Sequence, residues 1–131
     1  MRAERVAPDV FRLRTLAVNV YFVRDRTTRE WALVDTGLPG FATAIRRSAE
    51  QLFGGPPSAI LLTHGHFDHV SGLPTLADEW GVPVYAHPLE LPYLTGRSKY
   101  PPADPTVGGA WVAATPAAHN AATTTACLIR R

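Results

Sequence analysis

The sequence predicts an α/β protein whose sheet mixes parallel and antiparallel strands. Short apolar runs alternate with amphipathic segments along residues 1–100, which is the pattern of strands interleaved with helices. Three histidines and one aspartate, all within residues 64–69, directly follow one of these apolar runs. Because open α/β sheets carry their sites at the carboxyl ends of strands, we expect a functional site at that edge of the sheet.

The first part of the chain is rich in strands. Residues 6–13 alternate loosely around a Pro-Asp interruption, which predicts one short edge strand. Apolar and polar side chains alternate more clearly over residues 16–23, where β-branched and aromatic residues dominate, and this run predicts a second strand. A polar turn at residues 25–29 leads into residues 31–34, which we expect to form the return strand of a hairpin.

Helices enter the pattern after residue 40. Apolar residues recur at helical spacing over residues 41–53, and a Gly-Gly-Pro-Pro stretch ends that helix. Residues 59–62 are apolar throughout and predict a buried strand. We expect a second helix over residues 73–80, with Ser71 as its N-cap. A last strand over residues 82–86 and a short helix over residues 88–94 complete the predicted order.

The composition limits the classes of protein and partner. The chain has 131 residues, 46% of them apolar, which suits one domain with a hydrophobic core. Its 13 basic residues are scattered and exceed the 11 acidic residues only slightly, so charge does not predict nucleic-acid binding. Cys127 is the only cysteine, which excludes an intrachain disulfide. We see no signal peptide and no apolar run long enough to span a membrane, so we expect a cytoplasmic protein.

The strongest chemical signal is the cluster of His64, His66, Asp68 and His69. Neutral imidazole nitrogens and carboxylate oxygens are ligands that zinc and related metals prefer. The His-x-His spacing turns both rings to one side of an extended segment, and Asp68 and His69 follow on the turn that leaves it. A lone histidine is more often a surface or core residue, but packing does not readily explain three around one aspartate. We therefore predict a metal site.

Two further side chains end predicted strands. Asp35 follows residues 31–34 and opens a loop with Gly, Pro and Gly, at the same sheet edge as the histidines. Taken alone, such an aspartate is expected to cap local backbone amides. His87 ends the run 82–86, where a surface or strand-end histidine is the ordinary interpretation and a place in a pocket is the alternative.

The motif His64-x-His66-x-Asp68-His69 resembles the signature of the metallo-β-lactamase superfamily, a group of metal-dependent hydrolases that includes glyoxalase II-like enzymes. Asp35-Thr36-Gly37 resembles the first motif of the same superfamily. The resemblance implies an αββα sandwich. It also implies that Asp35 supports the metal loop by hydrogen bonding and is not itself a ligand.

The resemblance also implies a mechanism. One zinc ion would bind His64 and His66, and a second would bind Asp68 and His69, with iron or manganese as alternative metals. Hydroxide would attack an ester, thioester, lactone or related bond of a small-molecule substrate, and Asp68 would act as the catalytic residue that orients the nucleophile and takes its proton. The motif does not identify the substrate.

The resemblance covers residues 1–100, and residues 101–131 predict an irregular tail. Members of the superfamily take a third histidine from the second half of the sandwich. His119 is the only late histidine here, and it lacks the glycine and the following Thr-x-Gly of that motif. We therefore expect only the first half of the fold to be complete, in a truncated or frameshifted hydrolase, with His119 as the one candidate for the missing ligand.

Two other functions stay open at this point. The superfamily's persulfide dioxygenases and diiron flavoproteins use the same ligands for redox iron, and iron content would separate them from zinc hydrolases. The chain could also be an inactive remnant or a non-catalytic metal-binding or interaction module, which would expose an apolar sheet face. The sequence predicts neither the substrate nor the oligomeric state.

Overall fold

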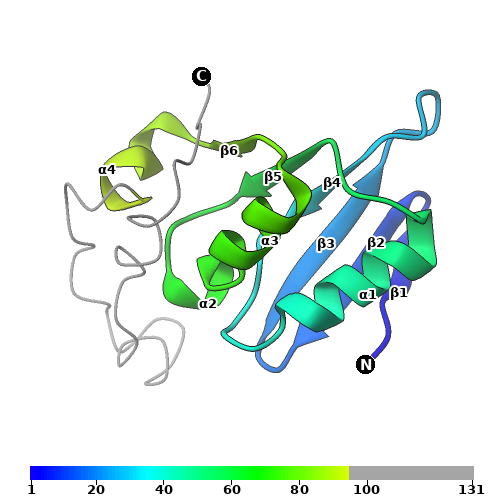
Figure 1. Cartoon of the computed structure of the whole chain (residues 1–131), viewed down its shortest axis with the longest axis horizontal. Helices are drawn as coiled ribbons and strands as arrows, with labels where there is room; N and C mark the ends of the chain where they lie inside the picture. The colour runs from blue at the N-terminus through cyan, green and yellow to red at the C-terminus, as the bar shows by residue number, and fades with distance from the viewer. Residues whose placement is uncertain (95–131) are drawn as a thin grey trace.

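The computed structural model describes residues 1–94. These residues form a six-stranded sheet in which the strands lie side by side in chain order (Figure 1). Neighbouring strands are antiparallel from the first to the fourth and parallel from the fourth to the sixth, so the predicted mixed α/β sheet is confirmed. The strands are β1 (Glu4–Ala7), β2 (Val10–Thr15), β3 (Val18–Arg24), β4 (Trp31–Val34), β5 (Ala59–Leu62) and β6 (Val84–Ala86).

Helices connect the parallel strands and cover one face of the sheet (Figure 1). The two longest, α1 and α3, contact each other and lie over one face of the sheet (Figure 1). Among residues 1–94, no helix is long and apolar enough to cross a membrane. The helices are α1 (Ala42–Phe53), α2 (Phe67–Val70), α3 (Leu73–Trp80), the 3₁₀ helix η1 (Pro88–Glu90) and α4 (Leu91–Leu94).

The N-terminal segment differs from its prediction. We expected one edge strand over residues 6–13, but the structure has a hairpin in which β1 pairs with β2. The predicted interruption is the turn of this hairpin, where Asp9 takes a left-handed backbone conformation (φ 58°). The Asp9 carboxylate stabilises the turn because it accepts hydrogen bonds from Arg24 at 2.6 Å and from Arg26 at 2.9 Å.

Ser71 also differs from its prediction as the N-cap of α3. Gly72 occupies the N-cap position, and Ser71 is the C-cap of α2. Its hydroxyl donates to the carbonyl of Phe67 inside α2. The reason is that the short helix α2 ends where α3 begins, so Ser71 between them hydrogen-bonds to the last turn of α2 and does not cap α3.

The core lies between the sheet and the helices α1 and α3. The strand register aligns Phe22 with Leu33 and Leu33 with Ile60, which forms a row of fully buried side chains across the sheet. Trp31 extends this layer and stacks on Phe53 of α1, with their ring centroids 4.7 Å apart. Because strand side chains alternate between faces, the opposite face carries the next residues of the same strands. Three large apolar residues there, Val23, Leu61 and Tyr85, are 37–39% exposed.

Gly72 lets two loops at the end of the sheet approach each other. It is buried, and a Cβ at this position would lie 2.5 Å from the carbonyl oxygen of Thr36. The close approach belongs to a wider contact, since Gly37 and Val70 form a parallel β-bridge beside it. The segment after β4 is therefore packed directly against the segment that carries the histidines.

Replacing Gly72 should test how much this close approach matters. Gly72→Ala should lower the free energy of unfolding by about 1–3 kcal/mol, because the Thr36 carbonyl must move away from the new methyl group. Gly55→Ala is the control, since a Cβ there meets nothing within 4 Å. Urea denaturation of both variants is the measurement, and equal midpoints for the two would contradict the predicted clash.

Candidate metal centre

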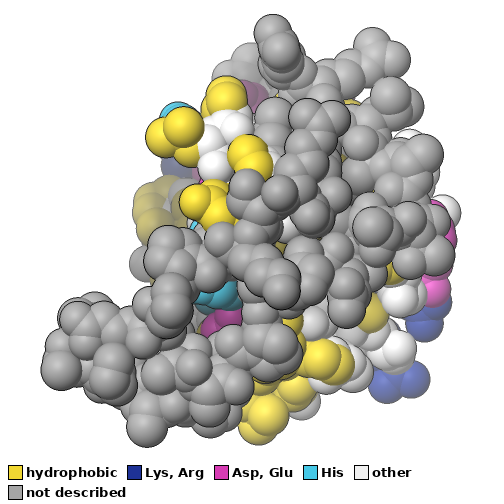
Figure 2. All heavy atoms as spheres, turned by 90° about the vertical axis from the view of Figure 1, so that its left-hand side faces the viewer, with side chains coloured by type: hydrophobic (Ala, Val, Ile, Leu, Met, Phe, Trp, Pro, Cys, Tyr) yellow, Lys and Arg dark blue, Asp and Glu magenta, His cyan; other side chains and the backbone are white. Residues whose placement is uncertain are grey.

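The predicted site residues follow strands whose ends meet at one edge of the sheet. Strands β4 and β5 are parallel neighbours, so their carboxyl ends lie together. Asp35 follows β4, while the histidine-rich loop follows β5 and continues into α2. The same edge faces the viewer in Figure 2, where histidine and acidic side chains reach the surface beside hydrophobic ones.

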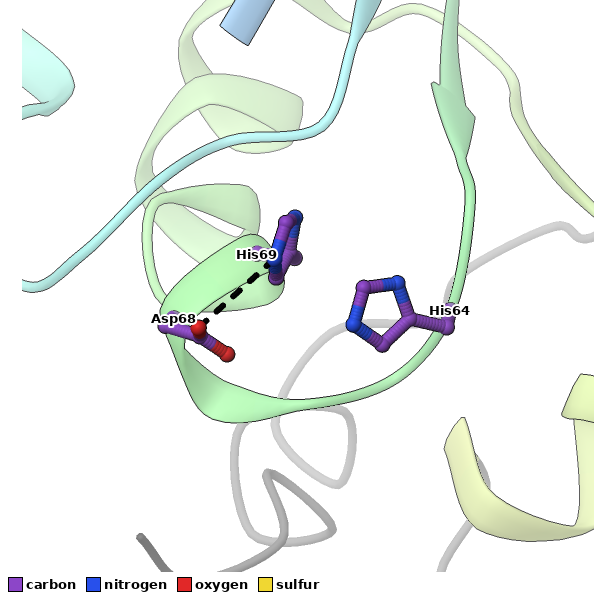
Figure 3. A group of neighbouring side chains, drawn as sticks. All are labelled: His64, Asp68 and His69. Carbon is purple, nitrogen blue, oxygen red and sulfur yellow. Dashed lines mark ion pairs between the residues drawn. The ribbon is translucent and has the colours of Figure 1, made fainter. Parts of the chain in front are cut away.

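His64, Asp68 and His69 converge at this edge. One ligand atom from each of them lies within 4.8 Å of the others. His64 projects from the loop after β5, and the ring of His69 faces it from α2 (Figure 3). Their ring centroids are 4.1 Å apart, and Nε2 of His69 lies 3.6 Å from Oδ2 of Asp68. Two imidazoles and a largely buried carboxylate therefore form a donor set that is able to hold a metal ion.

His66 lies beside this group. Its ring is perpendicular to that of His64, with the centroids 4.8 Å apart, but it is not one of the three converging ligands found among residues 1–94. The backbone explains this position, since His66 is the N-cap of α2 and its carbonyl accepts the N–H groups of His69 and Val70. The sequence pattern paired His64 with His66, whereas the turn of α2 brings His69 closer to His64.

Asp35 connects the two loops through its buried carboxylate. Oδ1 accepts the backbone N–H of Thr63 at 2.8 Å, and Oδ2 accepts the Thr63 hydroxyl at 2.7 Å. Oδ2 also lies 2.9 Å from Nδ1 of His69. Because an ionised carboxylate can only accept hydrogen bonds, Nδ1 of His69 is the donor to Asp35. The other ring nitrogen, Nε2, faces Asp68. Asp35 thus contacts the loop by hydrogen bonds and lies outside the converging group.

Thr63 sets the orientation of His64 in the same way. Its Oγ1 lies 2.9 Å from Nδ1 of His64. The single hydroxyl hydrogen of Thr63 is already donated to Asp35, so the hydroxyl oxygen is an acceptor toward the imidazole. His64 therefore carries its proton on Nδ1 and presents the lone pair of Nε2, which is the form that binds a metal.

The residue after Asp35 fixes the backbone of α2. Both the N–H and the hydroxyl of Thr36 donate to the carbonyl oxygen of His69, at 2.7 and 2.9 Å. Thr36 is completely buried, so these bonds are shielded from water. The position of His69 is consequently determined by the loop after β4 as well as by its own helix.

The two converging histidines have opposite pKa shifts in the metal-free protein. Burial lowers the pKa of His64, and the neighbouring His69 and His66 lower it further, so this imidazole is neutral at neutral pH. Burial alone would also lower the pKa of His69. The hydrogen bond to Asp35, together with the charges of Asp35 and Asp68, outweighs that effect and raises the pKa of His69.

The remaining candidates lie elsewhere. His87 is exposed at the turn after β6, where its Nδ1 accepts the N–H of Leu89 at 3.2 Å, and it is not part of the converging group. His119 and the predicted tail at residues 101–131 lie outside the described residues. The sequence interpretation missed Glu90, whose Oε2 accepts the N–H of Gly65 at 3.3 Å, because no spacing pattern linked it to the histidines.

The chain is an α/β protein with a mixed sheet. Imidazole and carboxylate groups that could hold a metal ion gather at the carboxyl ends of its parallel strands. A model of the metallo-beta-lactamase superfamily matches residues 13–124. The match covers most of the chain, so the chain belongs to this superfamily, as the resemblance predicted.

Relatives of this chain are described as hydrolases. The probable metallo-hydrolase YflN of Bacillus subtilis is 42% identical over 102 residues, which are 76% of this chain and 39% of YflN. The probable metallo-hydrolase YybB of the same organism is 40% identical over 86 residues, which are 66% of this chain and 37% of YybB. The chain therefore spans about two fifths of the length of these relatives.

Solved structures show the same fold. The subclass B3 metallo-beta-lactamase BJP-1 of Bradyrhizobium japonicum has a TM-score of 0.64 and 24% identity, over 81% of this chain and 39% of BJP-1. A B3 metallo-beta-lactamase described as having an active-site glutamic acid has a TM-score of 0.59 and 28% identity, over 67% of this chain and 33% of its own. The described sheet and helices thus correspond to one part of the metallo-β-lactamase fold.

Titration of the metal-free protein should resolve the two histidines. The pKa of His69 should lie above the ordinary histidine value of 6.5, and the pKa of His64 should lie below it. Both are measured by NMR of the imidazole C–H signals. Because the pKa of His69 is raised on folding, its pair with Asp35 contributes its full stability below about pH 6.5, and that contribution is lost as the pH rises through the raised pKa.

Asp35→Asn tests the cause of the His69 shift. It removes the hydrogen-bonding carboxylate, so the pKa of His69 should fall toward or below 6.5. Asp78→Asn is the control, because Asp78 is an exposed residue of α3. A His69 pKa that stays raised in Asp35→Asn would contradict this assignment.

Proposed function

We propose that this chain acts as a zinc-dependent hydrolase, one that cleaves an ester, thioester, lactone or related bond in a small molecule. The observation that carries this proposal is the convergence of His64, Asp68 and His69 within 4.8 Å at the carboxyl edge of the sheet. Membership of the metallo-β-lactamase superfamily supports a metallo-hydrolase, and so does the similarity to the probable metallo-hydrolases YflN and YybB. We also propose a cytoplasmic location.

The residues at the site fit zinc on chemical grounds. Catalytic zinc uses three protein ligands drawn from His, Asp, Glu and Cys, together with one open position. His64 and His69 would supply their Nε2 atoms and Asp68 a carboxylate oxygen, with His66 beside them as a further imidazole for this or a second ion. The hydrogen bonds from Nδ1 of both rings to Thr63 and Asp35 support this assignment, because ligating histidines normally use their second nitrogen in this way.

The chain's own residues would carry out distinct steps. A bound zinc ion would supply an acidified water molecule and a polarised carbonyl group. Asp68 would orient the attacking water and accept its proton at Oδ2, from its position beside Nε2 of His69. Asp35 would keep His69 in the tautomer that presents Nε2. The substrate would approach the side of the site on which His64 and His69 are partly exposed.

Metal content separates this proposal from its alternatives. Zinc at purification would favour hydrolysis, whereas iron would favour a redox member of the same fold. A protein that takes up neither metal would support the non-catalytic interpretation. Elemental analysis of the purified chain, followed by a small panel of lactone, thioester and phosphodiester substrates, is the direct test.

Removal of a single ligand should weaken both metal binding and hydrolysis. His64→Ala and Asp68→Asn should each lower zinc affinity and activity by about 100-fold, because each removes one of the three side chains that would bind the metal directly. Asp78→Asn is the control and should keep both properties, since its side chain lies on the exposed face of α3. Zinc affinity by chelator competition and the rate of hydrolysis are the measurements, and an active His64→Ala variant with full zinc content would rule out the assignment.

A further inference from the structure

We propose that Glu90 is a positioning residue for the histidine loop, and this inference rests on the proposed function. Gly65 lies between His64 and His66, and its backbone N–H donates to Oε2 of Glu90 at 3.3 Å. Glu90 comes from η1, after the neighbouring strand β6, so the contact joins two segments 25 residues apart in the chain. The carboxylate would hold the backbone on which the two histidines are mounted.

The surroundings of Gly65 make this contact important. Gly65 is buried, and a buried backbone N–H needs a hydrogen-bond acceptor to offset the loss of water. A carboxylate is a stronger acceptor than a neutral carbonyl group. The bond to Glu90 is therefore expected to restrict the backbone between the two imidazoles.

The fold brings Glu90 to this position in two steps. The parallel register of β5 and β6 aligns Leu62 with Ala86, so the segments that follow both strands leave the sheet at the same edge. His87 then forms the turn: its Nδ1 accepts the N–H of Leu89 at 3.2 Å, and its carbonyl accepts the N–H of Glu90 at 2.9 Å. This turn directs Glu90 back toward the histidine loop.

Glu90 acts through the backbone and is not one of the metal-binding side chains. Among residues 1–94, the group of converging ligands contains His64, Asp68 and His69 and does not contain Glu90. Its expected effect is therefore on the spacing of His64 and His66, with no change in the number of ligands. Such a residue should alter how tightly and in what geometry a metal is held, while the fold itself is retained.

Two variants of Glu90 distinguish anchoring from a general effect on folding. Glu90→Ala removes the acceptor, whereas Glu90→Gln keeps an oxygen that can accept the same N–H. Glu50→Ala is the control, because Glu50 is an exposed residue of α1. Amide hydrogen exchange at Gly65 in the zinc-free chain, zinc affinity by chelator competition and the visible absorption of the cobalt-substituted chain are measured for all of them.

The anchoring role predicts a specific pattern. In Glu90→Ala, exchange at Gly65 should accelerate about tenfold and zinc affinity should fall about tenfold, because the amide loses a charged acceptor and the loop becomes mobile. The cobalt absorption bands should shift as the ligand geometry relaxes. Glu90→Gln should restore most of all three properties, and Glu50→Ala should match the wild type.

Other outcomes would overturn either the positioning role of Glu90 or the proposed function of the chain. If Glu90→Ala leaves Gly65 exchange and zinc affinity unchanged, Glu90 does not anchor the loop. If Glu90→Ala and Glu90→Gln are equally impaired, the hydrogen bond to Gly65 is not the cause, and the positioning role is wrong. If the wild-type chain binds no zinc or cobalt, the proposed function fails, and Gly65 exchange alone then decides whether the anchor exists.

Discussion

The candidate site depends on the buried carboxylate of Asp35. Asp35 is 4% exposed, and burying an ionised group is costly unless it is paired and hydrogen-bonded. Three donors meet the requirement: the N–H and hydroxyl of Thr63 and the Nδ1–H of His69. The backbone of Asp35 also takes a left-handed conformation (φ 63°), which aspartate tolerates better than most residues. One side chain at the end of β4 thus fixes both the loop after β5 and the helix α2.

Much of the fold was predictable because its signals are local. The apolar runs and helical spacing gave β4, β5 and α3 with the bounds that the structure has, and α1 to within one residue. The failures occurred where local patterns have two explanations. A Pro-Asp pair can interrupt an edge strand or turn a hairpin, and only pairing between β1 and β2 decides between them. The helix α2 has four residues, too few for a periodicity to be visible.

The candidate ligands were recognisable from the sequence, but their arrangement in space was not. Ligand chemistry and spacing made His64, His66, Asp68 and His69 the candidates, and the structure brings His64, Asp68 and His69 together. Spacing in an extended chain placed His64 beside His66, but α2 begins at Phe67 and turns His69 toward His64. The contact of Glu90 with Gly65 depends on the register of β5 and β6, which a linear pattern does not contain.

The hydrogen bonds around Asp35 also determine which nitrogen each histidine offers. Asp35 receives the hydroxyl hydrogen of Thr63, and this leaves the Thr63 oxygen as the acceptor for Nδ1–H of His64. Asp35 accepts Nδ1–H of His69 directly. In its neutral form each imidazole therefore presents the lone pair of Nε2, and in both cases the hydrogen bonds that set this tautomer lead back to Asp35. A metal ion would find two of its donors already in the correct tautomer, so less of its binding energy is needed to reorganise the protein.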